Sequence, residues 1–406
     1  MSTQRTNLLE KRILLWRNAL FILFLLPGLS FSSWISRTPE VRDLLSASTA
    51  TMGWIIFGLA FGSIIGLLSA NKVILQTGAR YTAVCSIILI AVGLAIVGVS
   101  VFATLSSGVF WGLVIFGVGY GLAEVAINVE GAALEHAAKK TLLPALHASF
   151  SAGTLIGAGL GALAITLNLS VMTHLLFICL MVLVILISTY RFLPTDTGKS
   201  VNEGTEETVT KTTIVNVWKE PRTLLICLIV LGMAFAEGSA NDWLPLAMVD
   251  GFMVEPAIGT AIYTVFLTAM FVGRIGGGFF LDKYGRVPVL RVASGVATIG
   301  LALVIYTSNL PIAIIGVFFW GLGASLGFPV GLSAAGDDPN GAVSRVGIVS
   351  VAGYTAFLVG PPILGMIGEK TGLLNAMIIV LFIIIIAGLV SHAAKKPNEY
   401  ETNSKV

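Results

Sequence analysis

Four carboxylic acids lie within stretches that are otherwise apolar: Glu124, Glu130, Glu237 and Asp242. An acid in the hydrocarbon core of a membrane costs at least about 2.5–3.5 kcal/mol to insert, so each of these residues is a candidate for function. Burial favours the neutral form of a carboxyl group, and a group whose exposure alternates can therefore bind and release a proton. The chemistry open to these four residues is proton transfer.

The first pair of acids belongs to one predicted helix over residues 107–134. Tyr120, Glu124 and Asn128 are spaced i, i+4 and i+8, so they share one face and offer a phenol, a carboxyl and an amide to a solute. The alternative for Glu124 is a buried structural hydrogen bond. Glu130 points about a third of a turn away and lies nearer the inner surface, which favours a gate or a partner for the basic loop.

The second pair belongs to a predicted helix over residues 222–246. Glu237 and Asn241 are i, i+4 neighbours on one face, and Asp242 is expected close to the outer surface as a proton access point or gate. We rank Glu237 first and Glu124 second for proton coupling. His147, at the start of another predicted helix, can also titrate near neutral pH and is a candidate solute ligand; the alternative is a helix-end histidine bonded to a loop carbonyl.

The helices that must position these residues follow from composition. The chain has 406 residues, of which 56% are hydrophobic and only 11% are charged. A soluble domain carries about 25% charged residues, so this is an integral membrane protein. A bilayer span needs about 20 apolar residues. We expect twelve spans: 17–37, 49–70, 81–103, 107–134, 144–167, 171–193, 222–246, 257–281, 287–307, 310–335, 345–368 and 373–393.

Charge places the chain across the membrane. With the N-terminus inside, only Arg37, Arg42 and Lys370 face outward, and the other 24 − 3 = 21 lysines and arginines lie on the inner side. Basic residues are held on the cytoplasmic side, so both termini are expected there. The predicted parts are a six-helix bundle (1–193), a polar cytoplasmic linker (194–221), a second six-helix bundle (222–393) and a cytoplasmic tail (394–406).

The two bundles show internal repetition. Gly62 and Gly66 lie 211 residues before Gly273 and Gly277, and after a four-residue loop difference the offset becomes 207, as between Gly78 and Gly285. Parallel six-helix repeats related by an axis along the membrane normal are a transporter architecture, with the solute site near the midplane.

The segment 278–286 gives the repetition a family context. Its Gly278, Asp282, Lys283, Gly285 and Arg286 resemble the G-x-x-x-D-[RK]-x-G-R loop of the major facilitator superfamily. The segments 124–131, 147–151 and 236–243 resemble the YbjJ-like inner-membrane transporters, near the fucose-permease-like branch. The resemblance implies an all-α membrane fold of two six-helix bundles related by pseudo-two-fold symmetry, which works by alternating access.

The same resemblance implies a gate. Asp282 is expected beside a helix N-terminus, which attracts a carboxylate, and Arg274 and Arg286 can bind the same carboxylate. In the first half Asn71 replaces the acid, so that contact should be weaker. The expected gating residues are Asp282, Lys283, Arg286, Arg274, Asn71, Arg80 and Glu130.

Glycines and aromatic residues complete the expected site. Rows with small-x-x-x-small spacing, over 58–66, 153–161 and 273–277, allow close helix approach. We interpret them as seams between the two halves; static packing inside one half is the alternative. Beside Tyr120, Asn128, His147 and Asn241, the expected solute-binding residues are aromatic: Trp34, Tyr263, Trp320 and Tyr354.

The function expected from these features is secondary transport of a small polar solute, driven by proton symport. Proton-coupled export of drugs or metabolites is the alternative, and a channel-like or non-transporting sensor is a remote one. No enzyme motif occurs, and the three cysteines lack metal or disulfide spacing, so we expect no enzyme, no metal and no cofactor. The net charge of +3 is too small to suggest nucleic-acid binding. The expected partners are a small-molecule substrate, protons and the lipid bilayer, and the expected functional form is a monomer.

Overall fold

The computed structural model describes residues 2–138, 142–199, 217, 219–337 and 342–396, and regular structure in these ranges is helical. Twelve helical segments within them are long and apolar enough to cross a membrane. The predicted all-α fold with twelve spans is therefore confirmed. The predicted linker falls mostly on residues 200–216 and the predicted tail mostly on residues 397–406, which lie outside the described ranges, so both boundaries stay predictions.

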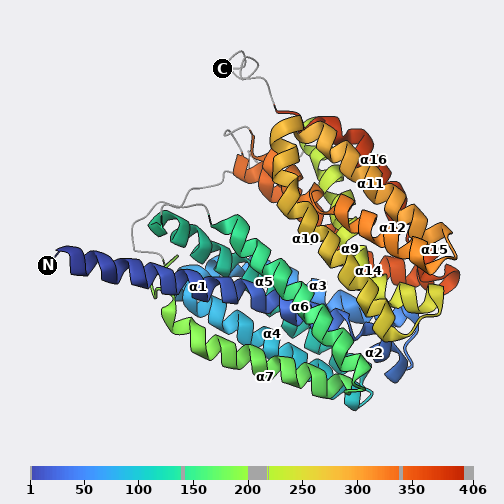
Figure 1. Cartoon of the computed structure of the whole chain (residues 1–406), viewed down its shortest axis with the longest axis horizontal. Coiled ribbons are helices and arrows are strands. Elements are labelled where there is room, and N and C mark those ends of the chain that lie inside the picture. The colour runs from blue at the N-terminus through green and yellow to red at the C-terminus, as the bar shows by residue number, and fades with distance from the viewer. Residues whose placement is uncertain (1, 139–141, 200–216, 218, 338–341, 397–406) are drawn as a thin grey trace. The chain divides into compact units, whose positions relative to one another are not determined.

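The chain divides into two compact units. Unit 1 comprises Met1–Gly204 together with Glu255–Thr264. Its helices are α1 (Ser2–Ile35), α2 (Thr38–Leu44), α3 (Thr49–Thr77), α4 (Ala79–Phe102), α5 (Ser106–Ala138), α6 (Leu143–Thr166), α7 (Val171–Thr189) and the short η1 (Tyr190–Phe192) (Figure 1).

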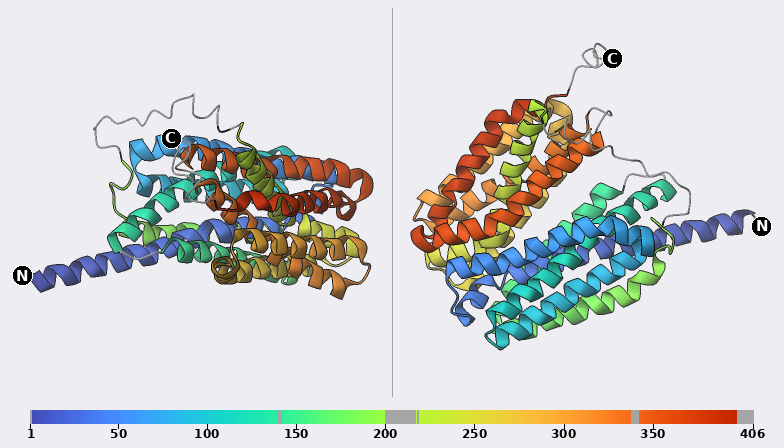
Figure 2. Two further views of the ribbon diagram at one scale, coloured as in Figure 1. Left: turned by 90° about the horizontal axis from the view of Figure 1, so that it is seen from above. Right: turned by 180° about the vertical axis from the view of Figure 1, so that it is seen from behind.

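Helix α5 lies at the centre of the packing in unit 1. Helices α3 and α4 both pack on it, while α1 packs on α6 and α7 packs on α4 (Figures 1 and 2). Glycines bring these backbones together: a Cβ atom at Gly58, Gly62 or Gly66 of α3 would collide with the backbone of α5. Gly153 and Gly157 of α6 meet the backbone of α1 in the same way.

These contacts correct the interpretation of the glycine rows. Each row just described packs on a helix of its own unit, and in unit 2 Gly273 and Gly277 face Ser325 and Leu326. The rows therefore serve packing inside one half, which was the alternative interpretation, rather than a seam between the halves. The small-x-x-x-small spacing predicts close approach of helices, and this prediction is confirmed.

Unit 2 comprises Thr205–Val254 and Val265–Val406. Its helices are α9 (Pro221–Phe252), α10 (Pro256–Tyr284, whose first residues belong to unit 1), α11 (Arg286–Tyr306), α12 (Leu310–Ala324), α13 (Gly327–Ala335), α14 (Ala342–Thr371), α15 (Leu373–Ala376), α16 (Ile378–Leu389) and η2 (Val390–Ala394). Helix α9 packs against α14, α16 and α13, and the tenth predicted span is interrupted between α12 and α13.

The internal repeat is visible in the backbone. Gly78 ends α3 with φ +90° and ψ 157°, and Gly285 ends α10 with φ +78° and ψ 171°. Positive φ strains any residue with a side chain, so glycine is required at both turns. The offset of 207 residues thus joins two positions with the same local conformation.

Candidate functional site

In the membrane-spanning part of unit 1, Glu124 and Asn128 of α5 are in contact, as their spacing predicts. The Asn128 amide nitrogen donates to the Glu124 carbonyl oxygen at 2.6 Å and approaches the carboxylate at 3.5 Å. The Asn128 amide oxygen lies 3.1 Å from Nε2 of His147 on α6. A carboxyl, an amide and an imidazole therefore form a chain across two helices.

Aromatic rings surround this chain. The edge of the Phe24 ring faces His147, with ring centres 5.3 Å apart. Tyr120, one turn before Glu124, is half-buried among the rings of Phe31 and Phe150. The predicted face of α5 thus combines a polar chain with an aromatic surround.

In unit 2 the central contact is an ion pair between two spans. Nη2 of Arg274 on α10 donates a hydrogen bond to Oε1 of Glu237 on α9, with 2.9 Å between the two atoms. The Glu237 side chain is 19% exposed and that of Arg274 is 36% exposed. Asn241 and Asp242, on the following turn of α9, are half-buried. Glu237 therefore has a cation as its partner, which its sequence neighbours did not indicate.

The predicted aromatic ligands are mostly packing residues in this structure. Trp34, Tyr263 and Trp320 are completely buried, and Trp320 meets the ring of Phe266. A side chain without exposed surface offers nothing to a solute in this conformation, so the expected contact of these three rings with solute finds no support. Tyr354 is half-buried beside Phe328, with ring centres 6.4 Å apart.

The predicted gate has different contacts from those expected. Asp282 and Lys283 are exposed, and Arg274 and Arg286 bind other carboxylates. In this structure the carboxylate partners of the two arginines are Glu237 and Asp337 instead of the expected Asp282. The gating role of these residues stays a prediction. Asn71, at the matching turn of unit 1, is exposed as well.

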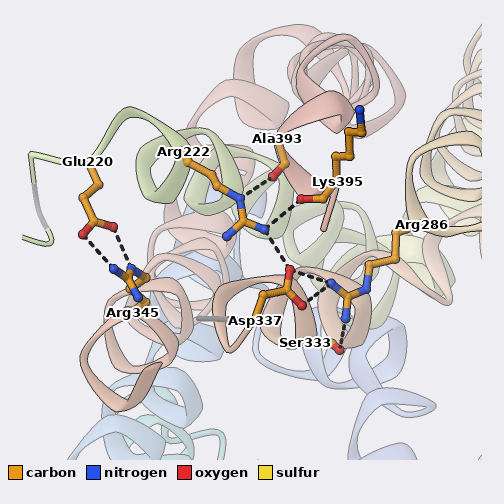
Figure 3. A network of polar contacts seen from close by, with 8 residues as sticks. All are labelled: Glu220, Arg222, Arg286, Ser333, Asp337, Arg345, Ala393 and Lys395. Carbon is orange, nitrogen blue, oxygen red and sulfur yellow. Dashed lines mark hydrogen bonds and ion pairs between the residues drawn. The ribbon is translucent and has the colours of Figure 1, made fainter. Parts of the chain in front are cut away.

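We call the end of each unit at which its first span begins the proximal end. Arg286 belongs to an ion network at the proximal end of unit 2 (Figure 3). Its Nη1 donates to both carboxylate oxygens of Asp337, at 2.7 and 2.8 Å, and its Nη2 donates to the Ser333 hydroxyl. Arg222, at the start of α9, donates to Asp337 at 2.8 Å and to the carbonyl oxygens of Ala393 and Lys395.

A second ion pair lies in the same view (Figure 3). Arg345 donates to both carboxylate oxygens of Glu220, at 2.7 and 3.0 Å. The Thr223 hydroxyl donates to the same carboxylate. Glu220 directly precedes the first span of unit 2 and so lies outside it. The hydrogen bonds from Arg345 lower the pKa of the Glu220 carboxyl below its ordinary value.

The proximal end of unit 1 holds a buried acid. Glu130 of α5 is completely buried, and the side chains of Trp16 and Thr197 and the guanidinium of Arg80 lie around its carboxylate. Arg80 Nη1 donates to the Leu193 carbonyl oxygen at 3.1 Å, and its guanidinium lies over the Tyr190 ring. Among the described residues the two carboxylate oxygens of Glu130 have no hydrogen-bond partner, so its role as a gate or as a partner for the basic loop stays a prediction.

Asp337, Arg222 and Ser333 were absent from the expected site, whereas their partner Arg286 was expected there as a gating residue. A signal for them existed: Glu130 plus the repeat offset of 207 residues is position 337, an acid in both halves. Arg37 was also overlooked; it is completely buried, bound to Glu40 at 2.8 Å and to the Leu169 carbonyl oxygen. Burial lowers the pKa of the Arg37 guanidinium and raises that of the Glu40 carboxyl, and their pairing opposes both shifts.

The cysteines and acids show no metal chemistry in the described part of the chain. Cys85, Cys179 and Cys227 are free thiols. Over the same residues no group of three or more histidine, cysteine or acidic side chains is arranged to hold a metal ion.

Known proteins share this sequence pattern and fold. The chain is 24% identical over 353 residues to an uncharacterized MFS-type transporter of Yersinia pestis, covering 86% of this chain and 88% of that protein. It is 25% identical over 374 residues to the membrane protein MosC of Rhizobium meliloti, covering 91% and 87%.

Among solved structures, the nucleoside transporter NupG matches with a TM-score of 0.78 at 15% identity, covering 94% of this chain and all of that one. The Escherichia coli fucose:proton symporter FucP matches with a TM-score of 0.63 at 14% identity, covering 94% and 98%. At these identities the structures establish the fold alone. The family model described as Major Facilitator Superfamily matches residues 19–344 and 243–405. The chain therefore belongs to the major facilitator superfamily and is a multi-pass membrane transporter.

Proposed function

We propose that this protein is a proton-coupled symporter of a small polar solute that works by alternating access. The observation that carries the proposal is the Glu237–Arg274 ion pair, which joins two spans at 2.9 Å. A carboxylate in a membrane interior stays ionised only while water or a cation compensates its charge. Separation of the pair would therefore let Glu237 take up a proton.

Glu124 supports the same proposal from unit 1. Its carboxyl belongs to the chain through Asn128 to the His147 imidazole, and these groups can exchange hydrogen bonds with a polar solute. We assign Glu124 a second coupling role, Asp242 a role in proton access, and Tyr120, Asn128, His147 and Asn241 contact with solute. One structural neighbour is a nucleoside transporter and another is a fucose:proton symporter. By analogy, both support a small polar solute, and the second supports proton coupling.

The cellular setting is part of the proposal. The distribution of lysine and arginine favours a cytoplasmic position for both termini. The resemblance to the YbjJ-like inner-membrane transporters favours a bacterial inner membrane, and we propose that a monomer suffices for transport. The proximal end of each unit would then face the cytoplasm. The finer resemblance to the YbjJ-like transporters stays a prediction.

The test is accumulation in proteoliposomes. A solute is first identified by thermal-shift screening of the purified protein and then supplied with an inward proton gradient. Glu237→Gln should abolish proton-driven accumulation and keep solute counterflow, because the site persists without its titrating group. The matched control is Glu255→Gln, an exposed acid before α10, which should accumulate solute like the wild type. Wild-type accumulation by Glu237→Gln would remove Glu237 from the coupling role.

A further inference from the structure

The charge balance of the Glu237–Arg274 pair restricts which solutes the protein can carry. Arg274 lies ten residues before the end of α10, inside the span, and an arginine keeps its charge at any physiological pH. When Glu237 is ionised, the two charges compensate each other at 2.9 Å. When Glu237 is protonated, Arg274 keeps a positive charge inside the membrane, which is unfavourable unless an anion replaces the carboxylate.

On the described elements packed against α9, no other acid lies near mid-span to supply that anion. On the elements packed against α9, the described parts of α12, α13, α15 and α16 carry no charged residue, and η2 contributes only His392. The charged residues of α14 lie near its ends, at Arg345, Glu369 and Lys370. The only other acid on this part of α9 is Asp242, five residues after Glu237 in the sequence and so not on its face of the helix.

The guanidinium group has room for a second partner. Among described residues the structure gives Arg274 one contact, from Nη2, so the Nε and Nη1 donors are available, and the side chain is 36% exposed. One turn further along α10, a Cβ atom built on Gly278 would meet no atom within 4 Å. A planar guanidinium with free donors and open space beside it fits a carboxylate, which it can bind through two parallel hydrogen bonds.

We propose that Arg274 binds the anionic group of the solute, and that the solute is an organic monoanion such as a carboxylate, carried together with one proton. The inference rests on the proposed function, since it needs Glu237 as the proton site. In the exchange step a hydronium ion transfers a proton to Glu237 Oε1 and leaves as water, the Arg274 Nη2–H···Oε1 hydrogen bond breaks, and the solute carboxylate accepts hydrogen bonds from the arginine, which keeps its protons. The site is neutral before the step (Glu⁻, Arg⁺) and neutral after it (GluH, Arg⁺, solute⁻), so transport is electroneutral.

The first experiment compares acids with neutral solutes of the same shape. The probes are nicotinate against nicotinamide, glucuronate against glucose and glycerate against glycerol, measured by the rise in Tm of the purified full chain at neutral pH. A solute that binds only the folded state raises Tm, and the rise grows with the ratio of its concentration to its Kd. At least one acid should stabilise the protein more than its neutral partner does. Equal stabilisation by both members of each pair, or none by any acid, would overturn the inference.

The second experiment uses two variants with opposite expected effects. Arg274→Gln should weaken binding of the acid about tenfold or more, as expected for loss of a charge-assisted hydrogen bond. Glu237→Gln should bind the acid as tightly as the wild type or more tightly, because it imitates the protonated carboxyl and releases Arg274. Arg291→Gln, on α11 and bonded to Ser391, is the matched control and should bind like the wild type. Affinity changes of the same sign in the two pair variants would overturn the inference.

A transport measurement separates this inference from the proposed function. Uptake of the stabilising acid into proteoliposomes should respond to a pH gradient and be insensitive to an imposed membrane potential. Suppose that Glu237→Gln abolishes proton-driven accumulation but uptake by the wild type responds to the membrane potential. Proton coupling then stands and the anion inference fails. If Glu237→Gln accumulates the acid like the wild type, the proposed function fails.

Discussion

Two acids 207 residues apart hold corresponding places in the two halves of this transporter and have different surroundings. Glu130 in unit 1 is completely buried, with Trp16, Thr197 and a single arginine, Arg80, around its carboxylate. Asp337 in unit 2 binds two arginines through three charged contacts of 2.7–2.8 Å. The repeat therefore keeps the position of the acid and changes the number of cations that compensate it.

These unequal surroundings indicate where each half depends on charge. Removal of one partner from a buried ion pair is costly because it leaves the other charge uncompensated. Among the described residues the carboxylate oxygens of Glu130 have no hydrogen-bond partner, so neutralising this acid breaks no such contact. Unit 2 should therefore depend on its acid for stability, and unit 1 should tolerate loss of the charge. Four changes test this contrast.

The largest effect is expected for Asp337→Asn. This change leaves the guanidinium groups of Arg286 and Arg222 without a carboxylate, and we expect a loss of about 3 kcal/mol in the free energy of unfolding. Denaturant unfolding of the purified protein in detergent measures it. A loss below about 1 kcal/mol would show that Ser333 and the carbonyl groups suffice to hold the arginines.

A smaller loss is expected for Arg222→Gln. Arg286 still binds Asp337 in this variant, while the contacts of Arg222 to Ala393 and Lys395 disappear. We expect about 1–2 kcal/mol, the usual range for charged hydrogen bonds. The double variant with Asp337→Asn, unfolded in the same way, should lose less than the sum of the two single losses, because both changes break one network. Additive losses would contradict the shared network.

The third effect is a pH dependence confined to the Glu220–Arg345 pair. The pKa of Glu220 is lower in the folded protein than its ordinary value. The contribution of the pair to the free energy of unfolding is therefore fully present above the unfolded pKa. It is lost as pH falls through the folded pKa, below about pH 4.3. The side chain of Glu220 is 36% exposed, and screening by solvent keeps the contribution under about 1 kcal/mol. Between pH 7 and pH 3 the wild type should lose more unfolding free energy than Glu220→Gln; equal losses would contradict the pairing.

The smallest effect is expected for Glu130→Gln. Glutamine keeps the shape of the side chain and removes a buried charge whose oxygens have no hydrogen-bond partner among the described residues, so the free energy of unfolding should change by no more than about 0.5 kcal/mol or should rise. Unfolding of this variant beside Asp337→Asn gives the direct comparison. A loss as large as that of Asp337→Asn would show that both halves depend equally on their acids.

The fold was largely predictable, because a membrane leaves a strong signal in hydropathy. Twelve apolar runs predicted twelve spans, and the paired turns at Gly78 and Gly285 share a backbone conformation that the repeat had indicated. The partners of each helix were not predictable from spacing alone. A glycine row specifies close approach, but the row at Gly58, Gly62 and Gly66 fits any neighbouring helix equally well.

The candidate site was predictable where partners share a helix and not where they come from different ones. Glu124 and Asn128 lie four residues apart and are in contact as expected. Arg274 is 37 residues from Glu237, and no periodicity within one span could join them. Trp34 and Trp320 lie within spans as expected, but depth in the membrane does not decide whether a ring faces a cavity or the packed interior.

The glycine contacts of α3 and α5 have a consequence for how this protein meets membranes of different thickness. At Gly58, Gly62 and Gly66 the two backbones touch without intervening side chains, so the contact contains no rotamers that could adjust to bending. A helix pair of this kind is stiff. When the hydrocarbon layer is thinner than the hydrophobic length of unit 1, we expect α3 and α5 to tilt together as one body. Bending of either helix would instead pull the touching backbones apart.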